Sequence, residues 1–291
     1  MKFLSKLLTT SVATTLFIPV LAQDTLKITV TGTRSEKPVE TFPGSIDVLN
    51  KEEIESKNTS DVMDILDDIP GVSFENIYST KEGIKGSYNG GNINIRGLDG
   101  NRVLMMIDGI RLPEQYFFSD YYVLGRSNYI NFDTLKAVEV FKGPASSLYG
   151  SDALGGLVYF RSLSPSDVLE NEDRTSFEIP FSYNSANDST KESIKFATKF
   201  SDNSAGLFIF TREDSSEYKV KTDDEFLDEE NKEGNNLFAN FEVDLNENSK
   251  INLVGEFINR EADSKLAPGN LDVLGYTKKE TNSKTIRDRV S

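Results

Sequence analysis

The hydrophobic pattern of residues 44–165 predicts a small domain built mostly of strands. Apolar residues occur there in short runs, and most runs end at glycine, proline or asparagine, which is typical of strands bounded by turns. The predicted strands are residues 45–50, 71–77, 92–97, 102–111, 135–143 and 157–162. We therefore expect a compact α+β domain with a mixed sheet.

Two short helices are expected between the first two strands. Asn50 and Glu53 have the spacing of a capping box, so a helix is predicted to begin there. Ser60 is predicted to cap a second helix, in which Val62, Ile65, Leu66 and Ile69 share one face. The Pro70-Gly71 pair is expected to end that helix.

The stretch INIRGLDGNRVLMMIDGIR, residues 93–111, raises the question of what its glycines do. Its two apolar runs are separated by Leu98-Asp99-Gly100-Asn101, and Asp-Gly is a common hairpin turn. We therefore predict a hairpin of residues 92–97 and 102–111. The glycines are expected at strand ends, where a residue without a Cβ permits positive φ or close backbone approach.

After Pro165 the chain becomes polar and its apolar residues alternate. Candidate strands are residues 176–183, 193–200, 206–212, 236–245 and 250–260, and the connections between them alternate between short and long. This alternation is typical of a transmembrane antiparallel β-barrel, whereas a soluble β-sandwich is the alternative. Five or six strands cannot close a barrel around a domain of this size, so we expect residues 166–291 to be the N-terminal part of a barrel and the chain to be a fragment.

The first 22 residues have the features of a secretory signal peptide. Lys2 and Lys6 precede a mostly apolar run, and Val20-Leu21-Ala22 fits a cleavage site. A short membrane anchor is the alternative, but the run is too short to span a bilayer. Residues 24–30, DTLKITV, are followed by a polar segment up to residue 40. They fit either a peptide that adds as a strand to a partner's sheet or the first strand of the next domain.

The amino-acid composition excludes several kinds of catalytic and metal site and disfavours one kind of partner. The formal net charge is -15, which disfavours a nucleic-acid partner, and the chain has no cysteine, histidine or tryptophan. Thiol catalysis, a Cys/His zinc site and a histidine-dependent triad are therefore excluded within these residues. No phosphate-binding loop or nucleophile elbow occurs, and the acidic residues of 223–230 lack the spacing of an EF-hand. We expect no catalytic residue, no metal site and no permanently bound cofactor.

Charged residues also lie on or beside the predicted strands, among them Arg96, Arg111, Glu139, Lys142 and Arg161. Such residues are either solvated or, inside a polar lumen, paired with a surrounding wall. The second interpretation is the one we expect here.

Residues 92–111 and 138–160, with DTLKITVTGTR at residues 24–34, resemble the motifs of TonB-dependent outer-membrane receptors. The resemblance covers residues 23–165, and the later strands agree with the family in their alternation of apolar and polar residues and in their order. It implies an N-terminal plug domain, residues 41–165, inside a 22-stranded barrel. It also implies a TonB box joined to the plug by a linker within residues 23–40. The contacts with TonB, which is energised by its inner-membrane complex, would be made by Asp24, Thr25, Leu26, Lys27, Ile28, Thr29 and Val30. Arg96, Glu139 and Lys142 would form a charged latch between plug and wall.

The same motifs look most like the haem/haemoglobin receptor branch of that family, so haem, a haemoprotein or another ferric complex is the expected cargo. That branch uses histidine ligands, which these residues lack. The apical loops, residues 75–91 and 112–129, would face the ligand through Tyr88, Tyr116, Tyr121 and Tyr122, although packing within the loops also explains these aromatics. A siderophore, cobalamin or oligosaccharide receptor is the alternative, and a secreted soluble protein with a plug-like domain is an alternative of another class. The expected location is the outer membrane of a Gram-negative cell, in contact with its lipid, with the TonB box reachable from the periplasm.

Overall fold

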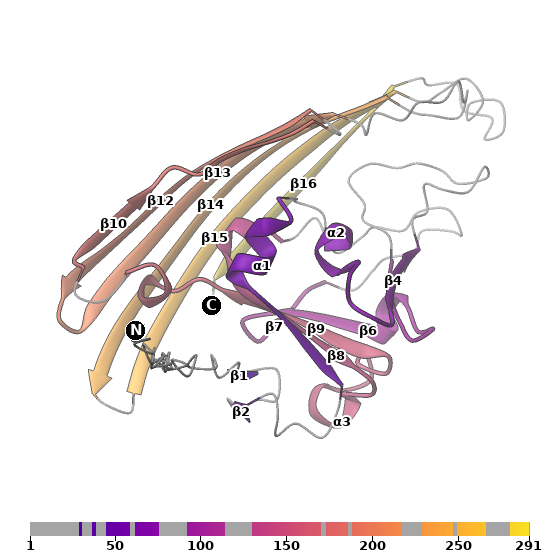
Figure 1. Ribbon diagram of the computed structural model, residues 1–291, viewed down its shortest axis with the longest axis horizontal. Helices are drawn as coiled ribbons and strands as arrows, with labels where there is room; N and C mark the ends of the chain where they lie inside the picture. Colours follow the sequence, from indigo (N-terminus) through magenta and orange to yellow (C-terminus); the bar gives the residue numbers. More distant parts are fainter. Residues whose placement is uncertain are drawn as a thin grey trace, which may run out of the picture.

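The protein consists of a small N-terminal domain and a curved antiparallel sheet that passes along one side of it (Figure 1). The computed structural model describes residues 29–30, 37–38, 45–58, 62–75, 92–113, 130–169, 173–185, 188–216, 229–246, 249–265 and 280–290. Within these residues, no helix has the length and apolar character needed to cross a membrane.

A five-stranded mixed sheet forms the centre of the N-terminal domain. Its order is β3 (Ile46–Asn50), β8 (Leu135–Lys142), β9 (Gly156–Ser162), β6 (Val103–Ile107) and β7 (Ile110–Arg111). β6 and β9 are parallel, and the other neighbours are antiparallel. Every residue of β6 is buried, which explains why its sequence VLMMI is continuously apolar rather than alternating. The predicted α+β domain with a mixed sheet is confirmed.

Among the residues that the structure describes, two α-helices follow β3, as expected. α1 (Lys51–Ser56) has the predicted capping box: Asn50 Oδ1 accepts from Glu53 N at 2.9 Å, and Glu53 Oε2 accepts from Asn50 N at 2.8 Å. α2 (Val62–Leu66) ends earlier than predicted, although Ile69 is still buried. α3 (Ser146–Tyr149) was not predicted.

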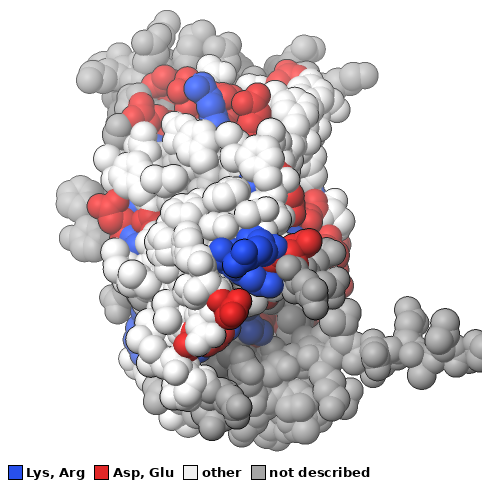
Figure 2. Space-filling model, turned by 90° about the vertical axis from the view of Figure 1, so that its left-hand side faces the viewer, with Lys and Arg blue, Asp and Glu red and all other residues white. Residues whose placement is uncertain are grey.

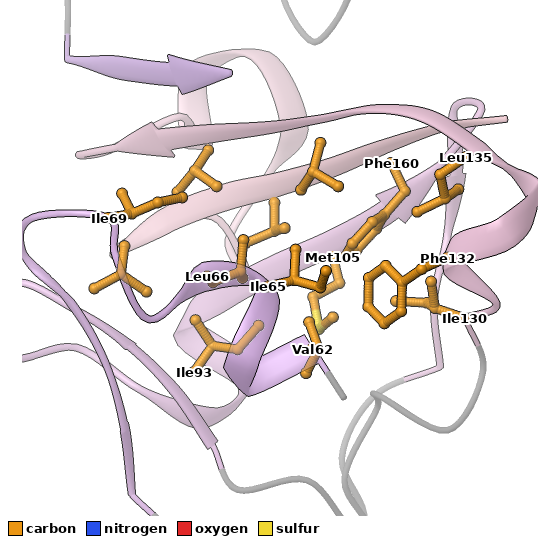
Figure 3. Close-up of a cluster of buried hydrophobic side chains, with 14 of the residues drawn as sticks. Val62, Ile65, Leu66, Ile69, Ile93, Met105, Ile130, Phe132, Leu135 and Phe160 are labelled. Carbon is orange, nitrogen blue, oxygen red and sulfur yellow. The ribbon is translucent and has the colours of Figure 1, made fainter. Parts of the chain in front are cut away.

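The apolar core occupies both faces of the five-stranded sheet. On one face, residues of α2, β5 (Asn92–Ile95), β6, β8, β9 and the 3₁₀ turn η5 (Phe132–Thr134) pack together (Figure 3). The rings of Phe132 and Phe160 meet edge to face in this cluster. On the other face, Leu104, Phe141 and Leu157 pack against Tyr149 of α3.

The predicted hairpin of residues 92–97 and 102–111 is wrong. β5 pairs with β4 (Val72–Glu75) in a separate two-stranded sheet, whereas β6 pairs with β9 and β7. The segment at Asp99-Gly100 leads into the 3₁₀ turn η3 (Gly100–Arg102). The two-residue hairpin turn lies at the other Asp-Gly pair, Asp108-Gly109, with φ of 47° and 84°. Positive φ at both positions is what a hairpin turn of this length requires, and Asp-Gly supplies it.

The second unit is a seven-stranded antiparallel sheet. Its strands are β10 (Thr175–Glu178), β11 (Phe181–Asn184), β12 (Ser189–Ser201), β13 (Ser204–Ser216), β14 (Glu229–Asn246), β15 (Ser249–Lys265) and β16 (Glu280–Val290). From β12 to β16 each strand pairs with the next in the chain, and β10 and β11 both pair with β12. The 3₁₀ turn η6 (Pro165–Asp167) precedes this sheet.

Three predictions about this sheet need correction. The segment predicted as one strand at residues 176–183 is two, β10 and β11, separated by Ile179-Pro180, because proline has no N–H to donate to the ladder. β12 to β15 are longer than predicted, and β16 was not predicted. Backbone pairing continues through polar residues such as Ser216↔Asn231, so alternation of apolar residues marks only the middle of each strand.

Near the N-terminus, β1 (Thr29–Val30) pairs antiparallel with β2 (Lys37–Pro38).

Candidate functional site

The outer face of the curved sheet is apolar and exposed. Alternate residues of its strands point away from the N-terminal domain and leave large apolar side chains uncovered, among them Phe177, Phe181, Ile194, Phe196, Phe208, Phe210, Leu237, Leu253 and Phe257. Figure 2 shows this side of the molecule, where uncharged side chains make up most of the surface and acidic residues gather near the top. An apolar surface of this extent indicates contact with another apolar phase or partner.

The apolar band has a length suited to a lipid bilayer. On β14 the outward positions from Leu237 to Leu245 are uncharged, which at ~3.3 Å per residue spans about 26 Å. Charged residues such as Arg212 and Glu233 lie beyond this band. A transmembrane strand tilted across the bilayer needs about 9–11 residues, and residues 237–245 have that length, so the outer face fits hydrocarbon.

The opposite face of the sheet is polar and buried against the N-terminal domain. Its central feature is Glu256 of β15, whose side chain is 0% exposed. Arg287 and Arg289 of β16 both pair with this carboxylate, Arg289 through Nε at 3.3 Å. Asn236 of β14 donates to Glu256 at 3.0 Å, and Thr134 of η5 donates at 3.4 Å. A buried carboxylate without such partners would be strongly unfavourable, so these contacts make its burial possible.

Arg289 connects this cluster to the N-terminal domain. Its Nη1 donates to Asp108 Oδ2 at 2.6 Å, and Asp108 also accepts from the backbone N and the Oγ of Ser162, at 2.9 and 2.5 Å. The β6–β7 turn holds Asp108 in the left-handed region, with its carboxylate directed at β16. We call the seven-stranded sheet, β10 to β16, the wall. Burial, followed by the negative charge of Asp108, raises the pKa of Tyr159 to about 12, so this phenol is neutral at physiological pH.

A second charged contact lies at Asp133 of η5. Its carboxylate pairs with Lys191 Nζ of β12 at 2.9 Å and accepts from Ser193 Oγ at 3.1 Å. Ser193 in turn lies 3.0 Å from Thr211 Oγ1 of β13. A short 3₁₀ turn of the N-terminal domain is thus joined to two wall strands.

A third charged contact joins Lys195 of β12 to Glu55 of α1 at 3.3 Å. The Lys195 side chain is 4% exposed, whereas Glu55 is 49% exposed. The wall lysine is therefore desolvated, and the carboxylate on the domain still contacts solvent.

Hydrogen bonds to backbone carbonyls and apolar contacts complete the interface. Arg260 donates to the carbonyl of Ile130 at 3.1 Å, and Asn240 donates to the carbonyl of Leu163 at 2.8 Å. Leu163, Val168 and Leu169, beside η6, pack on wall residues Ala197, Leu207, Ile209, Phe238 and Val254.

Asp167 stabilises the η6 turn that carries this apolar contact. Its carboxylate accepts from Ser164 N at 2.8 Å and pairs with Lys136 at 3.0 Å. Burial alone would raise the pKa of Asp167, but the Lys136 ammonium and the hydrogen bonds from Ser164 outweigh it and hold the pKa below its ordinary value.

The three residues predicted for the latch all lie in the N-terminal domain. Glu139 pairs with Arg161 at 3.7 Å, and Lys142 pairs with Asp47 at 2.5 Å, so both pairs join strands of the domain to one another. Arg96 is exposed and occupies a turn at φ 52°. Their latch role stays a prediction, because the contacts described above between domain and sheet are made by other residues.

The remaining predicted site residues are almost all beyond what the structure describes. The tyrosines Tyr88, Tyr116, Tyr121 and Tyr122 lie outside the described residues, as do Asp24 to Ile28 and the signal segment. Thr29 and Val30 form β1. Within the described ranges, no group of three or more acidic residues is arranged to hold a metal ion.

Sequence reasoning missed Asp108, Asp133, Glu256 and Arg289. A signal was present in the alternation of Glu256 with Phe257: a charge beside an outward aromatic on a strand must point to the opposite face. The partner of each charge could not be found in this way, because alternation gives the face but not the contact.

The N-terminal domain matches a known family model. Residues 38–157 match the TonB-dependent Receptor Plug Domain. The fold is shared with a solved structure, the pyoverdine outer membrane receptor FpvA from Pseudomonas aeruginosa PAO1 bound to pyoverdine. The TM-score is 0.62 at 16% identity, over 82% of this chain and 31% of that one.

Three curated proteins resemble the chain in sequence. Transferrin-binding protein A of Haemophilus influenzae is 31% identical over 208 residues, which is 69% of this chain and 22% of that protein. Heme/hemopexin utilization protein C of the same species is 34% identical over 50% of this chain and 18% of its own length. Vitamin B12 transporter BtuB of Vibrio vulnificus is 27% identical over 76% of this chain and 33% of its own length. The chain thus spans between about a fifth and a third of these relatives.

Proposed function

The chain belongs to the TonB-dependent receptor family, and from this premise we propose that it comprises the plug and first wall strands of an outer-membrane receptor that imports an iron source. The preferred cargo is haem or a haemoprotein. The observation that carries the transport role is the arrangement of the two units: a plug domain is bound through ion pairs to the polar face of a sheet whose other face is apolar and exposed.

This arrangement supports a location in the outer membrane of a Gram-negative cell. A soluble plug-like binding protein would leave the row Ile194, Phe210, Leu237 and Phe257 exposed to water, which is unfavourable. Outer-membrane lipid gives that row an apolar environment. We assign residues 1–22 to a signal peptide, 23–40 to the TonB box and linker, 41–165 to the plug and 166–291 to the wall.

Coupling to TonB is assigned to residues 24–30, which would add as a strand to the TonB sheet. TonB, driven by its inner-membrane complex, would then pull on the plug and displace it from the wall. Import of this kind makes and breaks no covalent bond, so no residue is given a catalytic role.

The cargo assignment is supported by the similarity to Heme/hemopexin utilization protein C, which has the highest identity of the relatives described above. Similarity to a vitamin B12 transporter over a larger share of the chain favours cobalamin as the second candidate. Tyr88, Tyr116, Tyr121 and Tyr122 are assigned to the ligand-facing loops, and Arg96, Glu139 and Lys142 to the latch.

The test uses the native gene, expressed in an outer-membrane host that lacks its own haem and cobalamin receptors. Growth on hemin as the sole iron source, with saturable hemin binding to whole cells, is the expected result. Growth that depends on added cyanocobalamin or a ferric siderophore, without hemin binding, would overturn the haem assignment and leave the receptor assignment intact.

The coupling assignment has a separate test. Leu26→Pro should abolish uptake because proline removes a donor from the added strand, and ligand binding should be unchanged. Pro38→Ala, outside residues 24–30, is the matched control and should import normally. Loss of binding in Leu26→Pro would contradict the coupling role.

A further inference from the structure

The plug-facing side of the wall carries a set of buried basic side chains, although the chain as a whole has a charge of -15. Lys195, Arg260 and Arg289 are buried there, and Lys191 and Arg287 are largely covered. The acidic residues buried on the same face are Glu242, which pairs with Lys250 at 3.3 Å, and Glu256.

Strand register places these cations at two main levels. Lys195 and Arg289 belong to one cross-strand row, which passes through Ile209, Phe238 and Glu256. Lys191 and Arg260 belong to a second row with the partly exposed Glu213, four residues further along the strands. At ~3.3 Å per residue the two levels are about 13 Å apart.

At three of these cations a carboxylate of the plug is a partner, and Arg289 also pairs with Glu256 of the wall. Asp133 pairs with Lys191 at 2.9 Å, Glu55 with Lys195 at 3.3 Å, and Asp108 with Arg289 at 2.6 Å. When the plug is displaced, these carboxylates leave with it, and the wall cations stay on their strands. Without these carboxylates this face of the wall becomes more positive, and a positively charged cleft attracts anions even when water enters it.

We propose that the wall cations Lys191, Lys195 and Arg289 are transit sites for an anionic cargo, whose carboxylates replace those of the plug during import. The inference rests on the proposed import function and specifies the class of cargo: a metal chelate with free carboxylates. In the resting state Asp133, Glu55 and Asp108 occupy the sites and keep them neutralised.

The proposal predicts opposite behaviour for the two partners of one ion pair. Lys195→Gln removes a transit site and should lower the rate of cargo import at least threefold, at unchanged cargo binding. Glu55→Gln removes only the resting partner, and it should import at the wild-type rate or faster. The double variant Lys195→Gln/Glu55→Gln, in which neither member of this pair is charged, should be as slow as Lys195→Gln, and Lys195→Arg should restore import.

The experiment measures initial uptake by cells that express the native gene with hemin, hemin dimethyl ester, ferric citrate and cyanocobalamin as probes. Hemin dimethyl ester has the size of hemin but no free carboxylate. Wild-type cells should import hemin faster than its ester, and this preference should be reduced in Lys195→Gln. Protein amounts in the outer membrane and heat-modifiable migration check that each variant is folded.

The outcomes separate the inference from the function on which it rests. Equal loss of import in Lys195→Gln and Glu55→Gln would indicate a structural ion pair and overturn the transit role. Import of cyanocobalamin alone would refute both the anionic cargo and haem, while import itself would stand. Import of ferric citrate but not hemin, with the same difference between variants, would support the inference and refute haem. Uptake of none of the probes would refute the proposed import and the inference together.

Discussion

The plug and the wall place their apolar residues on opposite sides. In the plug, Ile65, Val138 and Phe160 are buried inside and most charged residues lie outside, as in a water-soluble protein; the buried Glu139 pairs with Arg161. In the wall, Phe208, Leu237 and Phe257 are exposed outside, and Glu256 and Arg289 are buried inside. The plug is therefore organised by its own core, whereas the wall depends on the plug on one face and, in the proposed membrane location, on lipid on the other.

The comparison would be tested most strongly by removing one large aromatic from each unit. Phe160→Ala should lower the free energy of unfolding of the plug by about 3–5 kcal/mol, because Phe160 is 0% exposed and contacts Phe132. Phe257→Ala, at a side chain that is 43% exposed, is the control and should cost clearly less. Urea titration of the purified receptor in detergent, followed by hydrogen exchange of plug peptides, measures both. Equal losses would mean that the two units do not differ in this way.

A charge on the outer face gives the next largest effect. Phe208→Arg should destabilise the inserted wall by up to about 2–4 kcal/mol, because the arginine would lie within the apolar band, opposite Ala239. Glu233→Arg, on the same face but beyond the band, should change stability by about 0–1 kcal/mol. Folding into lipid vesicles at increasing urea gives the two values. A similar cost at both positions would show that this face does not contact hydrocarbon.

Removing the cation between plug and wall should have a smaller effect on stability and a clear effect on sealing. Arg289→Gln leaves Glu256 and Asp108 with one donor fewer, which should cost about 1–3 kcal/mol and loosen the contact. Entry of a large antibiotic into cells reports leakage past the plug. Arg96→Ala, predicted for the latch, should leak less than Arg289→Gln because its side chain is exposed. The reverse order would restore Arg96 as the principal latch residue.

The smallest effect is expected at Asp167, where the two units meet through apolar residues. Its folded pKa lies below the ordinary value of 3.8, so its stabilising contribution is present above about pH 4 and is lost as the pH falls through the folded pKa. Asp167→Asn should therefore cost ~1 kcal/mol at pH 7, from the loss of its charge-assisted bonds, and progressively less as the pH falls through the folded pKa of Asp167. Urea midpoints measured at a series of pH values from 7 downwards give the difference. A cost that is independent of pH would assign the effect to packing.

Parts of the plug were predicted correctly from motifs whose residues are close together in the sequence. Neighbouring residues determine the capping box of Asn50 and Glu53 and the strands around Val138 and Val158. These elements can therefore be read from the hydrophobic and polar pattern alone. The hairpin prediction failed because two Asp-Gly pairs compete, and only the strand partners, β9 and β4, decide between them. Those partners are set by tertiary packing, which no local pattern records.

The site was harder to predict than the fold for the same reason. Alternation shows that Lys195 and Glu256 face away from the apolar outer side of the wall, but their contacts with Glu55 and Thr134 cross more than a hundred residues of chain. β16 was missed because its inward residues Arg287 and Arg289 are charged and its outward residues Ile286 and Asp288 differ in character, which hides the alternation. Charge partners on separate units become visible only when the units are placed together.

The contact of Asp108 with Arg289 also constrains the order of assembly. The two residues are 181 positions apart, whereas the strand pairs of the five-stranded sheet join closer segments. Contacts between distant segments form late, because the intervening chain must first lose its freedom. We therefore expect the plug sheet to form early during biogenesis, with β15 and β16 closing onto it afterwards. The carboxylate at the Asp108 turn would then act as a template that guides the register of the incoming strand.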